Sequence, residues 1–218
     1  MASETPQKVY HLNTLLESEE LPIFLRNVQP DDAAAFARLL SDPRAATDPA
    51  IKPMDVSTAQ NVIARMLDSA SEPTVFMPDG KVLSGPGRVN TVVVLRSEQR
   101  PDGGVIGLGG YGAIKVWERN GAKVRAGDVG AMIDVDSRGK GYATEAMKLA
   151  IDWGFASVQE GGLQLDLVTI TTLDDNEPMI KLINDKLGLS VKGVEREAEM
   201  PGKTEIYWEL QKSDWIKK

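Results

Sequence analysis

A turn with two glycines, between a strand pattern and a helix pattern, restricts the fold of this chain more than any other feature. Residues 129–135 alternate apolar and other side chains, as in a half-buried strand. Gly139 and Gly141 follow, and an apolar stripe at helical spacing then runs through residues 143–154. The N–H groups at the start of a helix have no partner within the helix and carry the positive end of its dipole. The turn therefore predicts a place where a phosphate group binds.

Composition narrows the class of protein. With 218 residues, of which 42 % are apolar, the chain can form a single domain with a sizeable core. Its net charge of −7 argues against a basic face that binds nucleic acid of any sequence. The absence of cysteine excludes disulfides, thiolate metal sites and a cysteine nucleophile. We expect the single histidine, His11, to be solvated near a frayed terminus, so neither a metal site nor a Ser-His-Asp triad is predicted.

The N-terminal region does not read as a targeting segment. Residues 1–20 mix charges with isolated leucines and lack the continuous apolar stretch of a secretory signal. No run in the chain approaches the roughly 18 apolar residues that span a bilayer. These patterns predict a cytoplasmic protein without a membrane partner.

The order of predicted elements indicates an α+β fold with a mixed, largely antiparallel sheet. Strand patterns occur at 23–28, 90–96, 104–116, 129–135, 163–172 and in a final hairpin that ends near residue 210. Helix patterns occur at 30–40, 57–69, 142–157 and 176–187. Residues 71–88, rich in Pro, Gly and Ser, read as a long loop. We therefore expect a central sheet of six to seven strands, flanked by about four helices.

Two nucleotide-binding patterns are weak or absent. The spacing G-x-G-x-x-G occurs at Gly107, Gly109 and Gly112, but a hairpin signal follows instead of the helix that dinucleotide sites require. These glycines indicate instead a strand that another backbone or helix approaches closely. A nucleoside-triphosphate loop needs a Lys-Ser or Lys-Thr pair after its second glycine, and Gly141 is followed by Tyr142. A glycine-containing connection that binds no ligand stays open as an alternative.

Residues 128–146, DVGAMIDVDSRGKGYATEA, resemble the acetyl-CoA-binding segment of the GCN5-related N-acetyltransferase (GNAT) superfamily. The similarity is greatest to the branch that acetylates ribosomal proteins and small molecules. The superfamily pattern Arg/Gln-x-x-Gly-x-Gly/Ala corresponds to Arg138-Gly-Lys-Gly-Tyr-Ala143, whereas Val135 stands where this branch usually has proline. Weaker similarities follow the same order along most of residues 22–211. The resemblance implies a three-layer α/β/α acetyltransferase domain at 22–211, with an extension at 1–21 and a tail at 212–218.

The resemblance also implies how acetyl-CoA, the co-substrate, is held. The N–H groups of the glycine turn would bind its pyrophosphate, the main chain at the end of the preceding strand would bind its pantetheine arm, and an asparagine at the start of the last helix would reach the cofactor. The corresponding residues are Ile133, Asp134, Val135, Arg138, Gly139, Lys140, Gly141, Tyr142, Ala143, Thr144 and Asn176. For Asn176, a helix N-cap is an equally good interpretation.

The implied reaction is transfer of acetyl to a primary amine of a small molecule or of a peptide N-terminus. Asp128 matches the acidic position of the family and is the candidate general base; a solvated carboxylate at a strand end is the alternative. The last helix lacks the tyrosine that often protonates the leaving thiolate in related enzymes, and Tyr111 and Tyr207 read as packing residues. A module that binds acyl-CoA without transfer is therefore a second hypothesis. We expect a monomer or homodimer that uses no metal and binds no nucleic acid.

Overall fold

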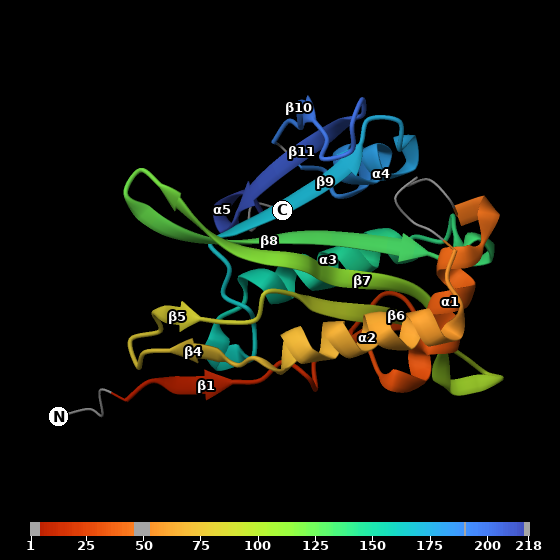
Figure 1. Ribbon diagram of the computed structural model, residues 1–218, viewed down its shortest axis with the longest axis horizontal. Helices are drawn as coiled ribbons and strands as arrows, with labels where there is room; N and C mark the ends of the chain where they lie inside the picture. Colours follow the sequence, from red (N-terminus) through yellow and green to blue (C-terminus); the bar gives the residue numbers. More distant parts are fainter. Residues whose placement is uncertain (1–4, 46–52, 190, 216–218) are drawn as a thin grey trace.

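An eight-stranded mixed sheet forms the centre of the protein (Figure 1). The computed structural model describes residues 5–45, 53–189 and 191–215. In spatial order, the strands of this sheet are β10 (Val194–Glu197), β11 (Thr204–Gln211), β9 (Leu167–Leu173), β8 (Ala122–Ile133), β7 (Arg100–Arg119), β6 (Val89–Ser97), β3 (Ile23–Asn27) and β2 (Leu15–Glu17). All neighbours are antiparallel except β8 and β9, which are parallel.

Helices cover both faces of this sheet. Figure 1 shows α2 (Val56–Ser71) in front of the sheet and α3 (Tyr142–Phe155) behind it. Helix α1 (Ala33–Ser41) packs beside α2, whereas α4 (Glu177–Lys181) continues as a π-helix, Leu182–Lys186. A last short helix, α5 (Lys212–Trp215), follows β11. None of the described helices is long and apolar enough to cross a membrane.

Two apolar clusters, one on each face, hold the layers together. Alternation along single strands divides the side chains between them: Phe24 joins the cluster under α1 and α2, and Leu25 joins the one under α3. Period-two alternation of this kind is what places successive strand residues on opposite faces. The three-layer fold class is therefore confirmed. The sheet has more strands than expected because residues 15–17, within the predicted extension, add the edge strand β2.

A second, three-stranded sheet corrects the prediction for residues 71–88. Strands β4 (Thr74–Phe76) and β5 (Val82–Ser84) form a hairpin there, and β4 also pairs with β1 (Gln7–Val9). The prediction failed because β4 and β5 have only three residues each, too few to stand out in a segment rich in Pro, Gly and Ser. In addition, β1, the other partner of β4, lies far away in the sequence. Residues 1–4 and 216–218, which belong to the predicted extension and tail, lie outside the described residues.

The glycine-rich strand behaves as expected. Strand β7 continues without a break through Gly107, Gly109 and Gly112, and the hairpin turn to β8 follows it. A Cβ atom on Gly107 would overlap the carbonyl oxygen of Met132 on β8. The close approach of a neighbouring backbone therefore explains Gly107, and the dinucleotide-binding interpretation lacks its helix.

His11 is buried, contrary to the expectation of a solvated side chain. Only 1 % of it is exposed; its Nε2 atom shares a hydrogen bond of 2.8 Å with Thr74 Oγ1, and its ring packs edge-on against Trp153 of α3. Burial and the nearby positive charge of Arg125 lower the pKa of His11 to about 4. The prediction failed because the segment after β1 packs between Thr74 of β4 and Trp153 of α3, and no local pattern encodes these distant contacts.

The buried His11 predicts a loss of stability in mild acid. In the unfolded chain, His11 becomes protonated as the pH falls below its ordinary pKa of 6.5. In the folded protein, it stays neutral until the pH reaches about 4. Across this window, His11 should cost the folded state up to about 3 kcal/mol. Urea denaturation at several pH values should therefore show a steeper loss for the native protein than for His11→Gln. Equal pH dependence of the two proteins between pH 6.5 and 4 would contradict this prediction.

Candidate functional site

Strands β8 and β9 are paired over only a short stretch. Their parallel register joins Ala126, Gly127 and Asp128 to residues 167–169, whereas on its other side β8 stays paired with β7 as far as Ile133. Figure 1 shows the two strands diverging toward the end of β8. Residues 129–133 therefore have no strand partner on the β9 side within the described chain. Unpaired strand edges can bind an extended ligand as an added strand.

The glycine turn lies just beyond this unpaired stretch. Gly139 and Gly141 have φ angles of +77° and +83°, in the left-handed region that favours glycine. Helix α3 begins directly afterwards at Tyr142. For the N–H groups of residues 139–144, no acceptor lies within the described chain. The turn therefore presents a row of free donors at the positive end of a 14-residue helix, as an anion site requires.

The predicted pantetheine-binding residues are partly occupied by contacts within the protein. The N–H of Asp134 donates to the Ile106 carbonyl at 2.7 Å, and Arg138 Nε donates to the Ile133 carbonyl at 3.0 Å. Val135 begins a 3-10 turn, Val135–Ser137, so the strand ends before it. The main chain without a β9 partner lies at 129–133, so of the three predicted residues it includes Ile133, and the contacts of Asp134 and Val135 with the pantetheine arm stay a prediction. No local signal could have located this stretch, because it depends on where β9 turns away.

Asp128 lies where the two strands separate. Its Oδ1 atom accepts hydrogen bonds from Thr169 Oγ1 at 2.7 Å and from Thr171 Oγ1 at 3.1 Å, both on β9. Burial raises the pKa of Asp128, and the two hydroxyl groups offset part of this rise. Asp128 is therefore half-buried within β8 rather than fully solvated at the end of the strand, and its role as the base stays a prediction.

Asn176 is the N-cap of α4. Its Oδ1 accepts from the N–H of Met179 at 3.4 Å, and its Nδ2 donates to Thr172 Oγ1 at 2.9 Å. Both polar atoms of its side chain thus have partners within the protein. The helix-cap interpretation accounts for these contacts, and a contact with the cofactor stays a prediction.

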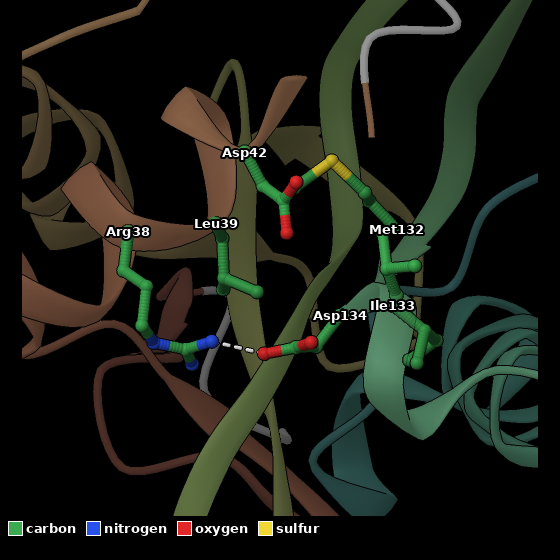
Figure 2. A pocket seen from close by; sticks show the side chains of 7 residues that line it. Arg38, Leu39, Asp42, Met132, Ile133 and Asp134 are labelled. Atoms are coloured by element: carbon green, nitrogen blue, oxygen red, sulfur yellow. Dashed lines mark hydrogen bonds and ion pairs between the residues drawn. The ribbon is translucent and has the colours of Figure 1, made fainter. Parts of the chain in front are cut away.

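A pocket lies between the end of α1 and the end of β8 (Figure 2). Arg38 spans it, forming an ion pair with Asp134 and donating to the Val105 carbonyl at 3.0 Å. Burial opposes the charge of Asp134, but the pairing with Arg38 and the hydrogen bond from the Asp136 N–H together outweigh it, and the pKa of Asp134 is lowered. Residues from both elements line the pocket: Arg38, Leu39, Asp42, Met132, Ile133, Asp134 and Val135.

A second ion pair joins the segment after α1 to the 3-10 turn Val135–Ser137, which precedes the glycine turn. Arg44 binds both Asp42, at 2.7 Å, and Asp136, at 3.0 Å. The sequence offered no signal for these partners, because Arg44 and Asp136 are 92 residues apart. Together with Arg38, this contact joins α1 and the segment after it to residues 134–136, just before the predicted cofactor turn.

The two tyrosines considered as proton donors have other partners. Tyr111 is 0 % exposed and its hydroxyl donates to the Ala150 carbonyl at 3.0 Å, while the hydroxyl of Tyr207 donates to Glu209 at 2.8 Å. Burial raises the pKa of both tyrosines. Packing therefore explains Tyr111, as predicted. Among the described residues, no group of three or more His, Cys, Asp or Glu side chains could hold a metal ion.

Comparisons with known proteins agree with this geometry. The sequence model of the acetyltransferase (GNAT) domain family matches residues 23–190. An uncharacterized N-acetyltransferase, p20 of Bacillus licheniformis, is 30 % identical over 176 residues, which cover 80 % of this chain and 83 % of the relative.

Solved structures share the fold. The ribosomal-protein-S5-alanine acetyltransferase of Vibrio fischeri matches with a TM-score of 0.63 and 18 % identity, over 93 % of this chain and 99 % of that one. RimJ of Mycobacterium smegmatis, in complex with CoA-disulfide, matches with a TM-score of 0.62 and 19 % identity, over 95 % of this chain and 88 % of that one. The family model, the curated relative and the shared fold lead to one conclusion: the chain belongs to the GNAT acetyltransferase family.

Proposed function

We propose that this protein transfers the acetyl group of acetyl-CoA to a primary amine, of a small molecule or of a peptide N-terminus, in a ternary complex. The observation that carries the proposal is the separation of β8 and β9, which begins at Asp128 and leads to the free donors of the glycine turn. An acidic group, an unpaired strand edge and an anion site then follow one another along a single path. Family membership and a relative bound to a CoA derivative support the same cofactor.

Acetyl-CoA fits the residues present along this path. The free N–H groups of residues 139–144 suit its pyrophosphate, and Arg138 and Lys140 add positive charge. The unpaired edge of β8 at 129–133 suits the amide groups of its pantetheine arm. When bound, acetyl-CoA supplies an acetyl group activated as a thioester. Asn176 stays a proposed cofactor contact. To reach the cofactor, its side chain would have to give up at least one of the hydrogen bonds with which it caps α4.

The residues of this chain have two chemical tasks. An alkyl ammonium, with an ordinary pKa of about 10.4, has no lone pair, so the acceptor must lose a proton before it attacks. Asp128 takes this proton, directly or through water. The nitrogen then bonds to the acetyl carbon, the C–S bond breaks, and a second proton from the nitrogen ends on the sulfur. A main-chain N–H on the unpaired edge of β8 can polarise the thioester carbonyl.

Acetyl-CoA should raise the melting temperature of the native protein and should fail to do so for Gly141→Glu. The new carboxylate would lie among the N–H donors that bind the pyrophosphate and would repel it. Gly121→Glu is the matched control, because Gly121 also has a positive φ, +76°, but lies in the β7–β8 hairpin turn, where an added Cβ atom would meet no other atom within 4 Å. Thermal unfolding of the native protein and of both variants, with and without acetyl-CoA, measures the shift in melting temperature. Gly121→Glu should keep the native shift. A native protein that no acyl-CoA stabilises would contradict the proposal.

An activity assay separates transfer from binding alone. Release of CoA thiol from acetyl-CoA can be followed with a panel of three acceptor classes: polyamines, amino sugars, and peptides whose first residue is alanine. Release that depends on an acceptor supports an N-acetyltransferase. Thermal stabilisation without release over the whole panel favours the second candidate, an acyl-CoA-binding module, which the lack of a tyrosine in residues 176–187 suggests.

We also propose that residues 22–211 form the acetyltransferase domain, with residues 1–21 and 212–218 as flanking segments. Two observations bear on the first segment: β1 joins the small sheet, and β2 is an edge strand of the large one. The first segment therefore packs on the domain over its described part.

A further inference from the structure

We propose that Thr169 and Thr171 are positioning residues that fix Asp128 Oδ1, so that Oδ2 is the oxygen that takes the proton from the acceptor amine. The inference rests on the proposed function, because it takes Asp128 as the base. It goes beyond that function because it assigns the proton transfer to one oxygen of Asp128 and identifies two residues that hold the carboxylate in place.

Both threonines reach the same carboxylate oxygen. They are two residues apart on β9 and therefore on the same face of the sheet, and Thr169 is the register partner of Asp128. Their hydroxyl groups donate to Oδ1 at 2.7 Å and 3.1 Å. Thr169 is 3 % exposed, so bulk water does not compete for its hydroxyl, and the other acceptor within reach, the Gly127 carbonyl, is farther away at 3.5 Å. Two donors on one oxygen leave the carboxylate a single orientation.

The other oxygen is left open. Oδ2 of Asp128 has no hydrogen-bond partner among the described residues, and it is absent from the buried side-chain atoms that lack a partner. It is therefore accessible to solvent rather than enclosed. Since Asp128 is the last residue of β8 that pairs with β9, this oxygen lies where the sheet opens.

The surroundings of Asp128 explain why neutral donors matter. Charges act on it from two strands, Arg196 on β10 and Glu205 on β11, but these two pair with each other at 2.5 Å. The buried Tyr111 of β7 is close enough for the charge of Asp128 to act on it, but its hydroxyl donates a hydrogen bond to the Ala150 carbonyl instead. A direct arginine partner would lower the basicity of a carboxylate and occupy its lone pairs. Two hydroxyl groups hold the carboxylate in place without neutralising it.

The test replaces each hydroxyl by a methyl group of similar size. In Thr169→Val and Thr171→Val, Asp128 loses a donor that stabilises its charged form, so its pKa should rise further. Titration of the 13C signal of the Asp128 carboxyl group, assigned by its absence in Asp128→Asn, measures this without any acceptor. Thr169→Ser and Thr171→Ser keep the hydroxyl and should restore the native titration. Thr91→Val is the matched control, since Thr91 is buried on β6 and its hydroxyl has no partner among the described residues.

A kinetic measurement completes the test, with acetyl-CoA and the best acceptor of the amine panel. The valine variants should lower kcat by roughly 10- to 100-fold and shift its acidic limb to higher pH, with KM for acetyl-CoA unchanged. Native titration and a native pH profile in both valine variants would overturn the inference. Failure of the proposed function has a different signature, because the native protein would then release no CoA thiol with any acceptor of the panel. Failure of Asp128 as the base would leave full transfer in Asp128→Asn. The titrations report on the threonines in either case.

Discussion

Asp128→Asn should lower kcat for acetyl transfer by roughly 10²- to 10⁴-fold, the usual contribution of a general base. Asparagine has the same shape and can still accept the hydroxyl groups of Thr169 and Thr171 through its amide oxygen, so the fold should persist. What it loses is the capacity to take a proton. Because the proposed pantetheine and pyrophosphate contacts lie at other residues, KM for acetyl-CoA should change little. Steady-state kinetics with varied acetyl-CoA measure both constants.

The pH profile of the native enzyme gives an independent check on Asp128. Burial raises its pKa, so protonation, which abolishes its function as a base, should set in at a higher pH than for an ordinary aspartate. Activity should therefore fall as the pH is lowered through this raised pKa. Asp102→Asn, which removes an exposed carboxylate on β7, is the control and should keep native kinetics. Full activity in Asp128→Asn would show that another group, or water alone, takes the proton.

Gly154→Ala should lower the free energy of unfolding by about 2–4 kcal/mol, the largest effect on stability that we predict. Gly154 lies in α3, where its missing side chain makes room for Tyr111 of β7. A Cβ atom would overlap the tyrosine hydroxyl oxygen and lie 2.8 Å from Cζ of the ring. Tyr111 cannot move aside, because it is 0 % exposed and its hydroxyl donates to the Ala150 carbonyl. The helix must therefore shift from the sheet, or the tyrosine must leave its acceptor unsatisfied.

Two further variants separate this clash from a general effect of alanine. Gly112→Ala adds a methyl group on β7 where no atom lies within 4 Å, and should change stability by less than about 0.5 kcal/mol. Combining Gly154→Ala with Tyr111→Phe removes the overlapping oxygen and should recover part of the loss, a coupling that a double-mutant cycle measures. Urea denaturation gives each free energy. Strictly additive effects of the two substitutions would contradict the proposed contact.

Local patterns accounted for most of the secondary structure. The turn at Gly139 and Gly141, with its strand before and its helix after, follows from chain geometry within about 25 residues. Glycine is favoured at both positions because their φ angles are positive. The hairpin between β7 and β8 and the final hairpin of β10 and β11 also follow from short-range signals.

Errors came where a partner lay far away in the sequence. The strands β4 and β5 are short, and β4 pairs with β1, 67 residues away along the register. His11 was misplaced for the same reason, since its burial depends on Thr74 and Trp153. For Asn176, sequence left two roles open, and its contacts with Thr172 and Met179 are those of a helix cap.

The amino-acid order was sufficient for the glycine turn before α3 and for the family, because both depend on residues that are close together along the chain. The sequence identified Asp128 as the acidic residue of the family pattern and the candidate base, but the groups that surround it are known only from the folded sheet. Where β9 leaves β8, which threonines reach its carboxylate and which oxygen stays open all depend on contacts across some 40 residues. Such contacts form when the layers pack, and no periodicity of a single segment encodes them.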